Sequence, residues 1–218
     1  MLFRAAIISA FTFTAAIGAE KAVSARAGAS HMNPRAWVIG PMINGRSYSR
    51  GMPLHPSPGP GRAWHIDLPQ PPASVHAVTF RHGSLAGKSR IVMRYRVEAA
   101  PGVRIMPRTA PTSPPWITLY FQRRGDNWSG RGPFESYRWF ATFATQTITP
   151  GEHQIVAPLT GRWTAVEVSN ARSNREGFAA AVAEAEQVGF VLGGGEGYGK
   201  GVFASGPARL IVTDFRVE

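Results

Sequence analysis

The sequence predicts a mainly β protein, an antiparallel two-sheet β-sandwich with one crossover α-helix near residues 174–186. Three observations predict this class. Short runs alternate apolar and polar residues, as in Ile91–Glu98, and a period of two is typical of strands with one buried face. Proline and glycine turns separate the runs at short intervals, which is typical of sandwiches and barrels. One segment alone changes to helical spacing.

The expected strands follow a region that proline punctuates, Leu54–Gly61. They are residues 64–68, 75–80, 91–98, 116–124, 137–143, 153–159, 162–168, 187–192, 201–205 and 208–217. The last of these is apolar on both faces, which favours a central strand that is covered on both sides.

The helix is predicted from apolar residues that recur three and four positions apart. They are Phe178, Ala181, Val182 and Ala185. Ser173-Asn174 precedes them and supplies a cap for the first turn. We expect the apolar face of this helix to pack on its own domain.

The amino-terminal residues 1–25 are predicted to be a signal peptide. Arg4 precedes an apolar stretch, Ala5–Ile17, and small residues follow it, the order typical of export signals. We therefore expect a connector over 26–36, one domain over 37–218, and a periplasmic or secreted protein. The apolar stretch is too short to span a membrane comfortably, so no transmembrane segment is expected in the mature chain.

The formal net charge of +11 raises the question of a nucleic-acid partner. The distribution of that charge argues against one, because the arginines are scattered, only three lysines occur, and no run of five basic residues appears. An anionic glycan or the cell envelope is the more suitable partner for an exported basic protein.

The block Trp116–Phe143 carries the candidate binding residues. In its first half Ile117, Leu119 and Phe121 share one face of a strand, and the intervening side chains are polar. Aromatic rings offer flat faces for the C–H face of a sugar, and arginine forks and amides match hydroxyls. The predicted ligand-binding residues are Tyr120, Gln122, Arg124, Asp126, Asn127, Trp128, Tyr137 and Arg138. The tryptophans Trp64, Trp116, Trp139 and Trp163, and Phe143, are assigned to the core.

An enzymatic alternative pairs Asp126 with Glu135 as two carboxylates of a glycan-degrading site. The opposing interpretation makes Asp126 the start of a turn through Gly125-Asp126-Asn127 and pairs Glu135 with an arginine, and the turn-forming tendency of Asp and Asn favours it. The chain has no Cys and no Gly-x-Ser-x-Gly segment. We assign no catalytic residue.

Two further patterns are typical of binding sites. His65, Asp67, His76 and His82 are residue types that bind metals, but their spacing does not place them on one face, so no metal ligand is assigned. Gly194–Lys200 has the glycine and lysine spacing of a phosphate-binding loop, yet Gly201 stands where that loop needs Ser or Thr. A loop between strands is expected there, with Tyr198 and Lys200 at its tip.

The strand end Phe190–Gly194, the glycine-rich loop after it and the closing Ala208–Val217 resemble the galactose-binding-like jelly roll. That superfamily includes carbohydrate-binding modules and the complex I intermediate-associated protein type domain. The resemblance covers Trp37–Val217 and implies a jelly-roll sandwich whose concave face or rim loops bind sugars. It also implies a structural calcium ion, for which Asp67 or Asp214 would be the carboxylate; no other cofactor is expected.

Two functions of different classes follow from the sequence. The first is an exported, non-catalytic domain that recognises a glycan or polysaccharide, including an anionic one. The alternative is an envelope or assembly-factor domain whose partner is another protein. A glycan-degrading enzyme is the third interpretation. Fold resemblance alone does not choose among them, since one fold serves many functions.

Overall fold

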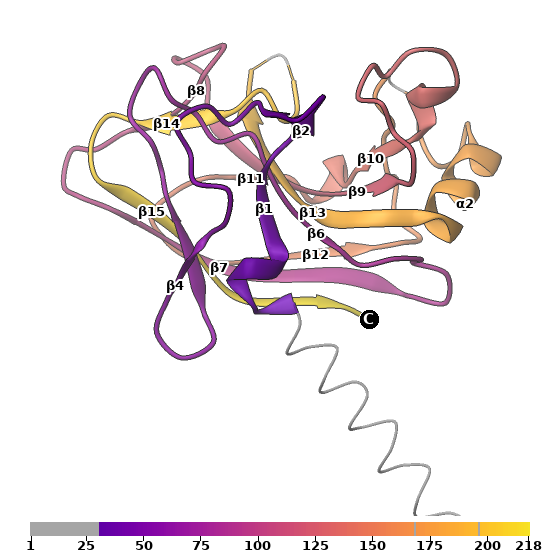
Figure 1. Ribbon diagram of the computed structural model, residues 1–218, viewed down its shortest axis with the longest axis horizontal. Coiled ribbons are helices and arrows are strands. Elements are labelled where there is room, and N and C mark those ends of the chain that lie inside the picture. Colours follow the sequence, from indigo (N-terminus) through magenta and orange to yellow (C-terminus); the bar gives the residue numbers. More distant parts are fainter. Residues whose placement is uncertain (1–30, 168, 196) are drawn as a thin grey trace, which may run out of the picture.

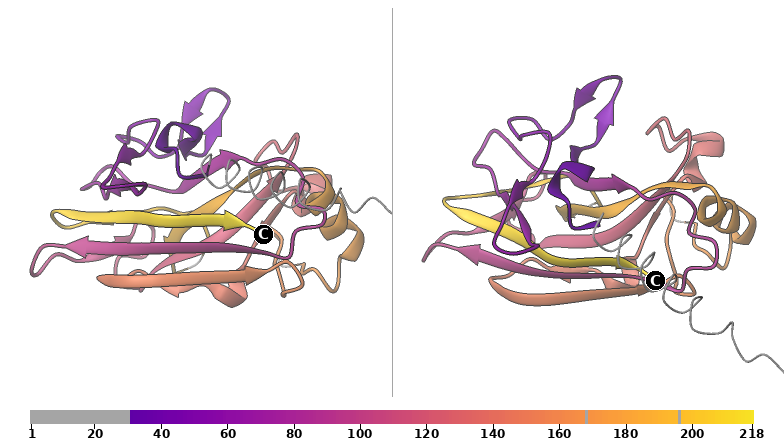
Figure 2. Two further views of the ribbon diagram at one scale, coloured as in Figure 1. Left: turned by 90° about the horizontal axis from the view of Figure 1, so that it is seen from below. Right: turned by 60° about the horizontal axis from the view of Figure 1, so that its bottom comes forward.

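The computed structural model describes residues 31–218 except 168 and 196. The predicted signal peptide, 1–25, and the first part of the 26–36 connector lie outside the described residues. The chain forms a sandwich of two main antiparallel sheets (Figures 1 and 2). The first sheet has the order β1-β6-β13-β9-β10, with β11 paired to β9, and the second has the order β12-β7-β15-β5-β4.

The first sheet contains β1 (Trp37–Gly40), β6 (Ala77–Arg81), β9 (Pro115–Arg123), β10 (Arg138–Phe140), β11 (Gln146–Thr147) and β13 (Ala185–Gly194). The second contains β4 (Ser57–Pro58), β5 (Trp64–Asp67), β7 (Arg90–Ala99), β12 (Gly151–Pro158) and β15 (Ala208–Val217). Two small pairs complete the strands, β2 (Met42–Ile43) with β3 (Arg46–Ser47), and β8 (Ile105–Pro107) with β14 (Val202–Ala204). Short 3-10 turns occupy Pro34–Ala36, Gly132–Ser136 and Thr142–Ala144.

The predicted helix is α2 (Arg175–Ala183). Asn174 caps it as expected, since its side chain accepts a hydrogen bond from the Gly177 backbone N–H at 2.9 Å. The helix lies at one end of the sandwich (Figure 1). Phe178 packs edge-on against Phe121 and Trp139, so the apolar face does cover its own domain. Helical structure ends earlier than predicted, because Ala185 already belongs to β13.

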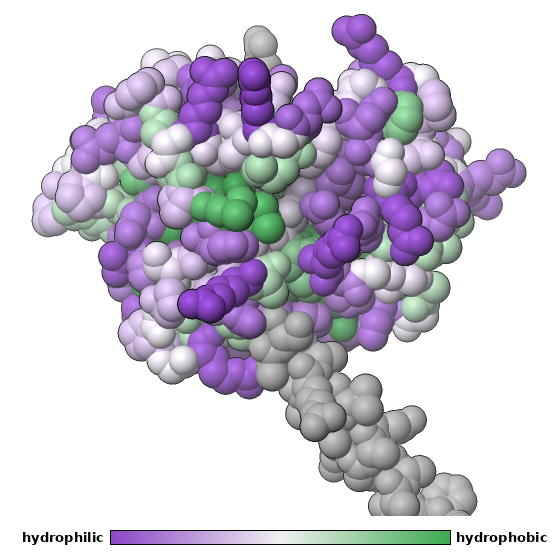
Figure 3. All heavy atoms as spheres, viewed as in Figure 1, coloured by the Kyte–Doolittle hydropathy of each residue, from purple (hydrophilic) through white to green (hydrophobic). Residues whose placement is uncertain are grey.

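The core lies between the two sheets and is rich in aromatic rings. Trp37 of the first sheet and Trp64 of the second are fully buried, with ring centroids 4.7 Å apart. Phe190 and Phe215 contact the same cluster. Full burial of one such side chain stabilises the fold by about 1.5–3 kcal/mol. The outer surface seen in Figure 3 is mostly hydrophilic, with apolar residues gathered in small patches.

Most predicted strands are present, and β15 is central in its sheet as expected. The prediction of a strand over 162–168 is wrong for the described residues 162–167, in which Thr164 alone forms isolated bridges, to Phe140 and Asn170. The strand over 137–143 is shortened to β10. Two core assignments were also wrong: Phe143 is 44% exposed, and Trp116 is half-buried at the surface beside Tyr198.

The β2–β3 hairpin was not predicted, although its turn has a recognisable signal. Asn44 and Gly45 have φ values of 49° and 73°. Two consecutive residues with positive φ form the tight turn that an Asn-Gly pair favours in hairpins. The strands on either side have only two residues each, so no alternation marks them in the sequence. This hairpin forms one wall of the site described below.

Candidate functional site

Both faces of β9 are covered, and this determines the character of the candidate site. Ile117, Leu119 and Phe121 face the core, as the alternation predicted. The opposite face is not open to water: Tyr120 is 0% exposed and Gln122 is 5% exposed. Tyr120 stacks on Phe140, with centroids 5.8 Å apart. The outer face of the first sheet is therefore a second, smaller core.

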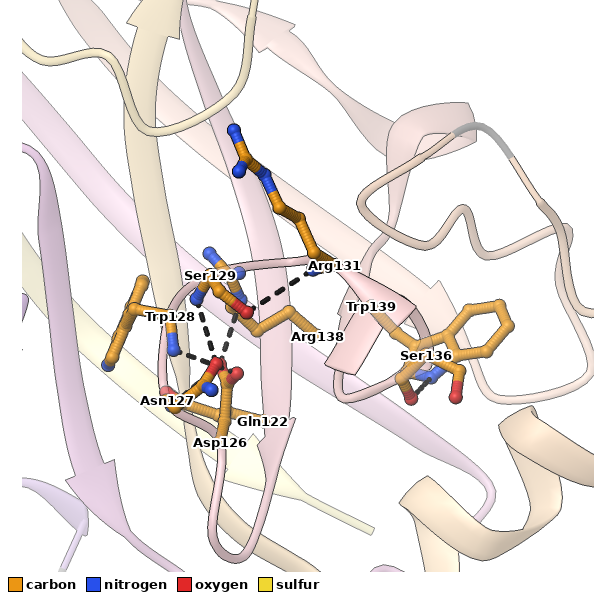
Figure 4. A network of polar contacts seen from close by, with 9 residues as sticks. All are labelled: Gln122, Asp126, Asn127, Trp128, Ser129, Arg131, Ser136, Arg138 and Trp139. Carbon is orange, nitrogen blue, oxygen red and sulfur yellow. Dashed lines mark hydrogen bonds and ion pairs between the residues drawn. The ribbon is translucent and has the colours of Figure 1, made fainter. Parts of the chain in front are cut away.

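The loop between β9 and β10 covers this face, and a buried ion pair holds the loop (Figure 4). Arg138 Nε lies 2.8 Å from Asp126 Oδ2, and the Asp126 side chain is 0% exposed. The Gln122 amide nitrogen donates to the same oxygen at 3.0 Å, and the Trp128 backbone N–H donates to Oδ1 at 3.0 Å. A turn beginning at Asp126, which the sequence favoured, is thus present.

Burial is the main cause of the pKa shifts of Asp126 and Arg138. Burial raises the pKa of Asp126, while Arg138 and the hydrogen bonds to the carboxylate act in the opposite direction. Burial also lowers the pKa of Arg138, against the attraction of Asp126. Each member therefore depends on the other for compensation of its charge. The pair fixes the loop rather than leaving a free carboxylate for chemistry.

Trp128 lies above the pair. Its indole contacts the Arg138 guanidinium, whose carbon is 4.7 Å from the ring centroid, a favourable cation–π arrangement. Trp128 has φ of 65°, a conformation uncommon for a residue with a bulky side chain. Gly130, in the same loop, packs closely against Val166, since an added Cβ would lie 2.7 Å from Val166 Cγ1. The loop is thus built to place this indole over the sheet.

A groove runs beside Trp128 on the outer face of the first sheet. It consists of two cavities of about 260 and 290 Å³. Both have Met42, Trp128 and Gln187 in their walls, so they are adjacent. Figure 1 shows the β2–β3 hairpin and the β9–β10 loop on the same side of this sheet. The groove lies between them, and the sheet forms its floor.

The lining of the groove combines an aromatic ring with amides. Trp128 and Met42 supply apolar surface, and the polar side chains are Asn44, Thr79, Arg81, Gln122, Asp126, Asn127, Glu186 and Gln187. The Thr79 hydroxyl donates to Gln187 Oε1 at 3.1 Å, which leaves the Gln187 amide N–H groups for a ligand. Gln122 Oε1 is buried without a hydrogen-bond donor among the described residues. Arg81 pairs with Glu186 at 2.7 Å.

The eight predicted ligand-binding residues fall into three groups. Gln122, Asp126, Asn127 and Trp128 line the groove, and Arg138 lies beneath Trp128. Tyr120 lies below the surface and presents no ring face to solvent. Arg124 and Tyr137 lie outside the groove lining; the Tyr137 ring instead lies under the Arg123 guanidinium at 4.7 Å.

Several groove residues were not predicted from the sequence. Thr79, Arg81 and Gln187 come from β6 and β13, which pair in the centre of the sheet. Asn44 comes from the hairpin turn. The polar positions of those strands carried a signal, since Thr79 and Arg81 alternate with buried Val78 and Phe80. That β13, with Gln187, lies beside these residues of β6 follows only from the pairing of two segments that are distant in the sequence.

The candidate metal-binding residues Asp67, His65 and Asp214 lie outside the groove lining. His65 Nε2 is 3.8 Å from Asp67 Oδ2, and Asp67 pairs with Arg209 at 2.7 Å. Asp214, the other calcium candidate, pairs with Arg216 at 2.8 Å. Within residues 31–218, apart from 168 and 196, no group of three or more His, Asp or Glu side chains converges as metal ligands would.

The enzymatic alternative concerns Asp126 and Glu135. Asp126 is enclosed by Arg138, and Glu135 contributes a backbone carbonyl that accepts a hydrogen bond from Val166. The predicted ion pair of Glu135 with an arginine is not among the ion pairs of the described residues.

Comparisons with protein-family models and with curated proteins find no match to this chain. In the part of the chain that the structure describes, no helix has the length and apolar character needed to cross a membrane. The fold is established as a mainly β sandwich of two antiparallel sheets. Any statement about function therefore depends on the geometry of the groove.

Proposed function

We propose that this protein is an exported, non-catalytic carbohydrate-binding domain of the galactose-binding-like jelly-roll type, and that the groove on the outer face of its first sheet is the binding site. One observation carries the proposal. Two adjacent cavities share the half-buried Trp128, and amide side chains of β9, β13 and the hairpin turn line them as well.

The chemistry of the groove suits a neutral sugar. An indole packs well on the C–H face of a pyranose ring, and its fixed position removes an ordering cost on binding. Amides donate and accept at once, as vicinal hydroxyls require. Gln187 lines both cavities, and because its amide oxygen accepts from Thr79, its amide N–H groups keep hydrogen-bonding capacity for a ligand. Each cavity is near the lower limit for small-molecule sites, about 300 Å³.

The carboxylates of the groove support a binding role. Asp126 and Glu186 line it, and each is ion-paired with an arginine, Arg138 and Arg81 respectively. A glycosidase requires one carboxyl group that is free to give a proton and a second that acts as base or nucleophile. Carboxylates that neutralise arginines are suited to holding the loop and the strand edge in place.

Glycan-array screening followed by isothermal titration calorimetry tests the proposal. Trp128→Ala is expected to weaken sugar binding about tenfold or more, which corresponds to about 1.4 kcal/mol of lost contact. Trp128→Phe, which keeps a flat ring, should retain most of the affinity. Gln187→Ala removes the amide donors without touching the loop and is expected to weaken binding as well.

Tyr198→Ala is the matched control, because Tyr198 is an exposed aromatic outside the groove. The Tyr198→Ala variant should bind the sugar with the same affinity as the unaltered protein. If Trp128→Ala and Gln187→Ala bound the sugar as tightly as the unaltered protein does, the proposal would be contradicted. Release of reducing ends from a bound glycan would favour the enzymatic alternative, and a co-purifying protein lost in both variants would favour the protein-interaction alternative.

A further inference from the structure

A larger cavity lies beyond the β2–β3 hairpin and is separate from the groove. Its volume is about 560 Å³. Three segments form it: the stretch after β3, the loop that leads into β6, and the stretch after β8. The lining residues are Tyr48, Arg50, Gly51, Pro72, Ala73, Ser74, His76 and Arg108. None of these lines the groove, so the cavity needs an explanation of its own.

The cavity carries positive charge without compensation. Arg50 and Arg108 are both exposed, and no Asp or Glu is among the lining residues. Neither arginine has an ion-pair partner within the described residues, whereas Arg81 in the groove is paired with Glu186. Two unpaired guanidinium groups in a concave site attract anions. Their planar forks match the two oxygens of a carboxylate, sulfate or phosphate.

The inner wall is a buried pair of polar side chains. Ser74 is 3% exposed and His76 is 7% exposed. His76 Nδ1 is 2.9 Å from the Gly199 carbonyl oxygen, and its Nε2 is 3.0 Å from Ser74 Oγ. A carbonyl only accepts, so Nδ1 carries the proton and the Ser74 hydroxyl donates to Nε2. The imidazole is thereby held as a neutral group behind the arginines.

Further cations face this imidazole. Burial lowers the pKa of His76, and Arg108 and Lys200 lower it further. At neutral pH the cavity therefore has fixed arginine charges and no charge on its wall. Gly201, with φ of 92°, brings the chain close to the ring, because an added Cβ would lie 2.8 Å from Nε2. The wall is closely packed, and the charge lies on the exposed Arg50 and Arg108.

We propose that this cavity binds an oxyanion, a carboxylate, sulfate or phosphate group carried by a small polar molecule, with Arg50 and Arg108 as the paired donors. The volume exceeds what a bare oxyanion fills, so the remainder of the cavity accommodates the molecule that carries it. Tyr48, which is 53% exposed, offers that molecule a ring and a hydroxyl. This site does not depend on the groove.

Calorimetric titration at pH 7.5 and constant ionic strength tests the proposal with four probes: sulfate, phosphate, glucuronate and neutral glucose. The anions are expected to bind, and glucose is not expected to bind at this cavity. The double variant Arg50→Gln/Arg108→Gln should bind the anions at least tenfold more weakly. Arg162→Gln is the matched control, because Arg162 is exposed and lies outside both sites. It should bind as the unaltered protein does.

A second readout follows the imidazole of His76 by NMR, since it lies in the wall of the cavity. Saturating anion should shift its ring signals in the unaltered protein and in Trp128→Ala, which leaves this cavity intact. Tighter binding of glucuronate than of phosphate identifies a sugar-borne anion, and the reverse identifies a free one. Unchanged affinity in the double variant, an equal loss in Arg162→Gln, or an unmoved His76 signal would overturn the proposal.

Discussion

The outer faces of the two sheets differ in their exposure to water, although the sequences of β7 and β9 alternate in the same way. On β7 of the second sheet the outward residues Arg94, Arg96 and Glu98 are exposed and charged: Arg94 donates to Gln154 at 2.7 Å, and Arg96 pairs with Glu98 at 2.8 Å. On β9 of the first sheet the outward residues Tyr120 and Gln122 are buried. A loop covers one face and water covers the other, and this difference explains why the same pattern serves different purposes.

The comparison also applies to ion pairs. Asp126 and Arg138 are removed from water, so the loss of either partner leaves a costly charge behind. Arg96 and Glu98 are both more than two-fifths exposed, and solvent screens their attraction. The charged side chains on the outer face of the second sheet keep that face hydrated. Charge on the first sheet positions the loop that carries Trp128.

The largest expected effect is on packing. Tyr120→Ala should lower the free energy of unfolding by about 3–5 kcal/mol, because a large ring is removed from an enclosed site. Val156→Ala on the outer face of the second sheet is the control and should change it by less than about 0.5 kcal/mol, since Val156 is 37% exposed. Chemical denaturation measures both. Similar values for the two variants would mean that the loop does not cover β9.

The buried ion pair is expected to give the next largest effect. Arg138→Leu should cost about 3 kcal/mol in urea denaturation, because Asp126 remains buried without its partner. The double variant Arg138→Leu/Asp126→Leu should recover much of that loss. A double variant as unstable as the single one would show that the two side chains do not act as a pair.

Acid should weaken the fold through histidines near the first sheet. Burial lowers the pKa of His31 from 6.5 to about 4 and also lowers the pKa values of His76 and His82. The unfolded chain binds these protons first, so the free energy of unfolding decreases as pH falls from 6.5 toward 4. Each histidine contributes up to about 1.4 kcal/mol per pH unit.

Urea titrations at pH 7.5, 6.5, 5.8 and 5 measure this slope, above the range in which carboxylates dominate. His76→Asn should reduce the slope, because one titrating group is removed. Stability that is constant or rises toward pH 5 would contradict the assignment of these histidines as buried neutral groups.

The smallest change in the free energy of unfolding is expected for the exposed outer face of the second sheet. Arg96→Gln should change the free energy of unfolding by less than about 1 kcal/mol, since its partners Glu98 and Glu152 stay hydrated. Added salt should reduce even that difference. A loss comparable to that of Arg138→Leu would remove the contrast between the two faces.

The sequence predicted those parts of the fold in which one side of an element meets water. The alternating β7 and the capped helix α2 are of this kind, whereas the central β15 was predicted from its apolar residues on both faces. It did not predict β2 and β3, which are too short to show a period, or the exposure of Phe143. Among the residues that line the groove, it indicated Gln122 of β9 and the loop residues Asp126, Asn127 and Trp128 by residue type. It did not find Gln187.

The sequence by itself determined the mainly β class, the core half of β9 and the turn at Asp126, because period, turn chemistry and apolar content act over a few residues. Only the tertiary structure decided that Tyr120 is enclosed and that the hairpin faces the β9–β10 loop across the sheet. It also decided that Arg50 and Arg108 share one cavity. These outcomes require strands distant in the chain to pair, and the free energy of that pairing depends on the whole sandwich.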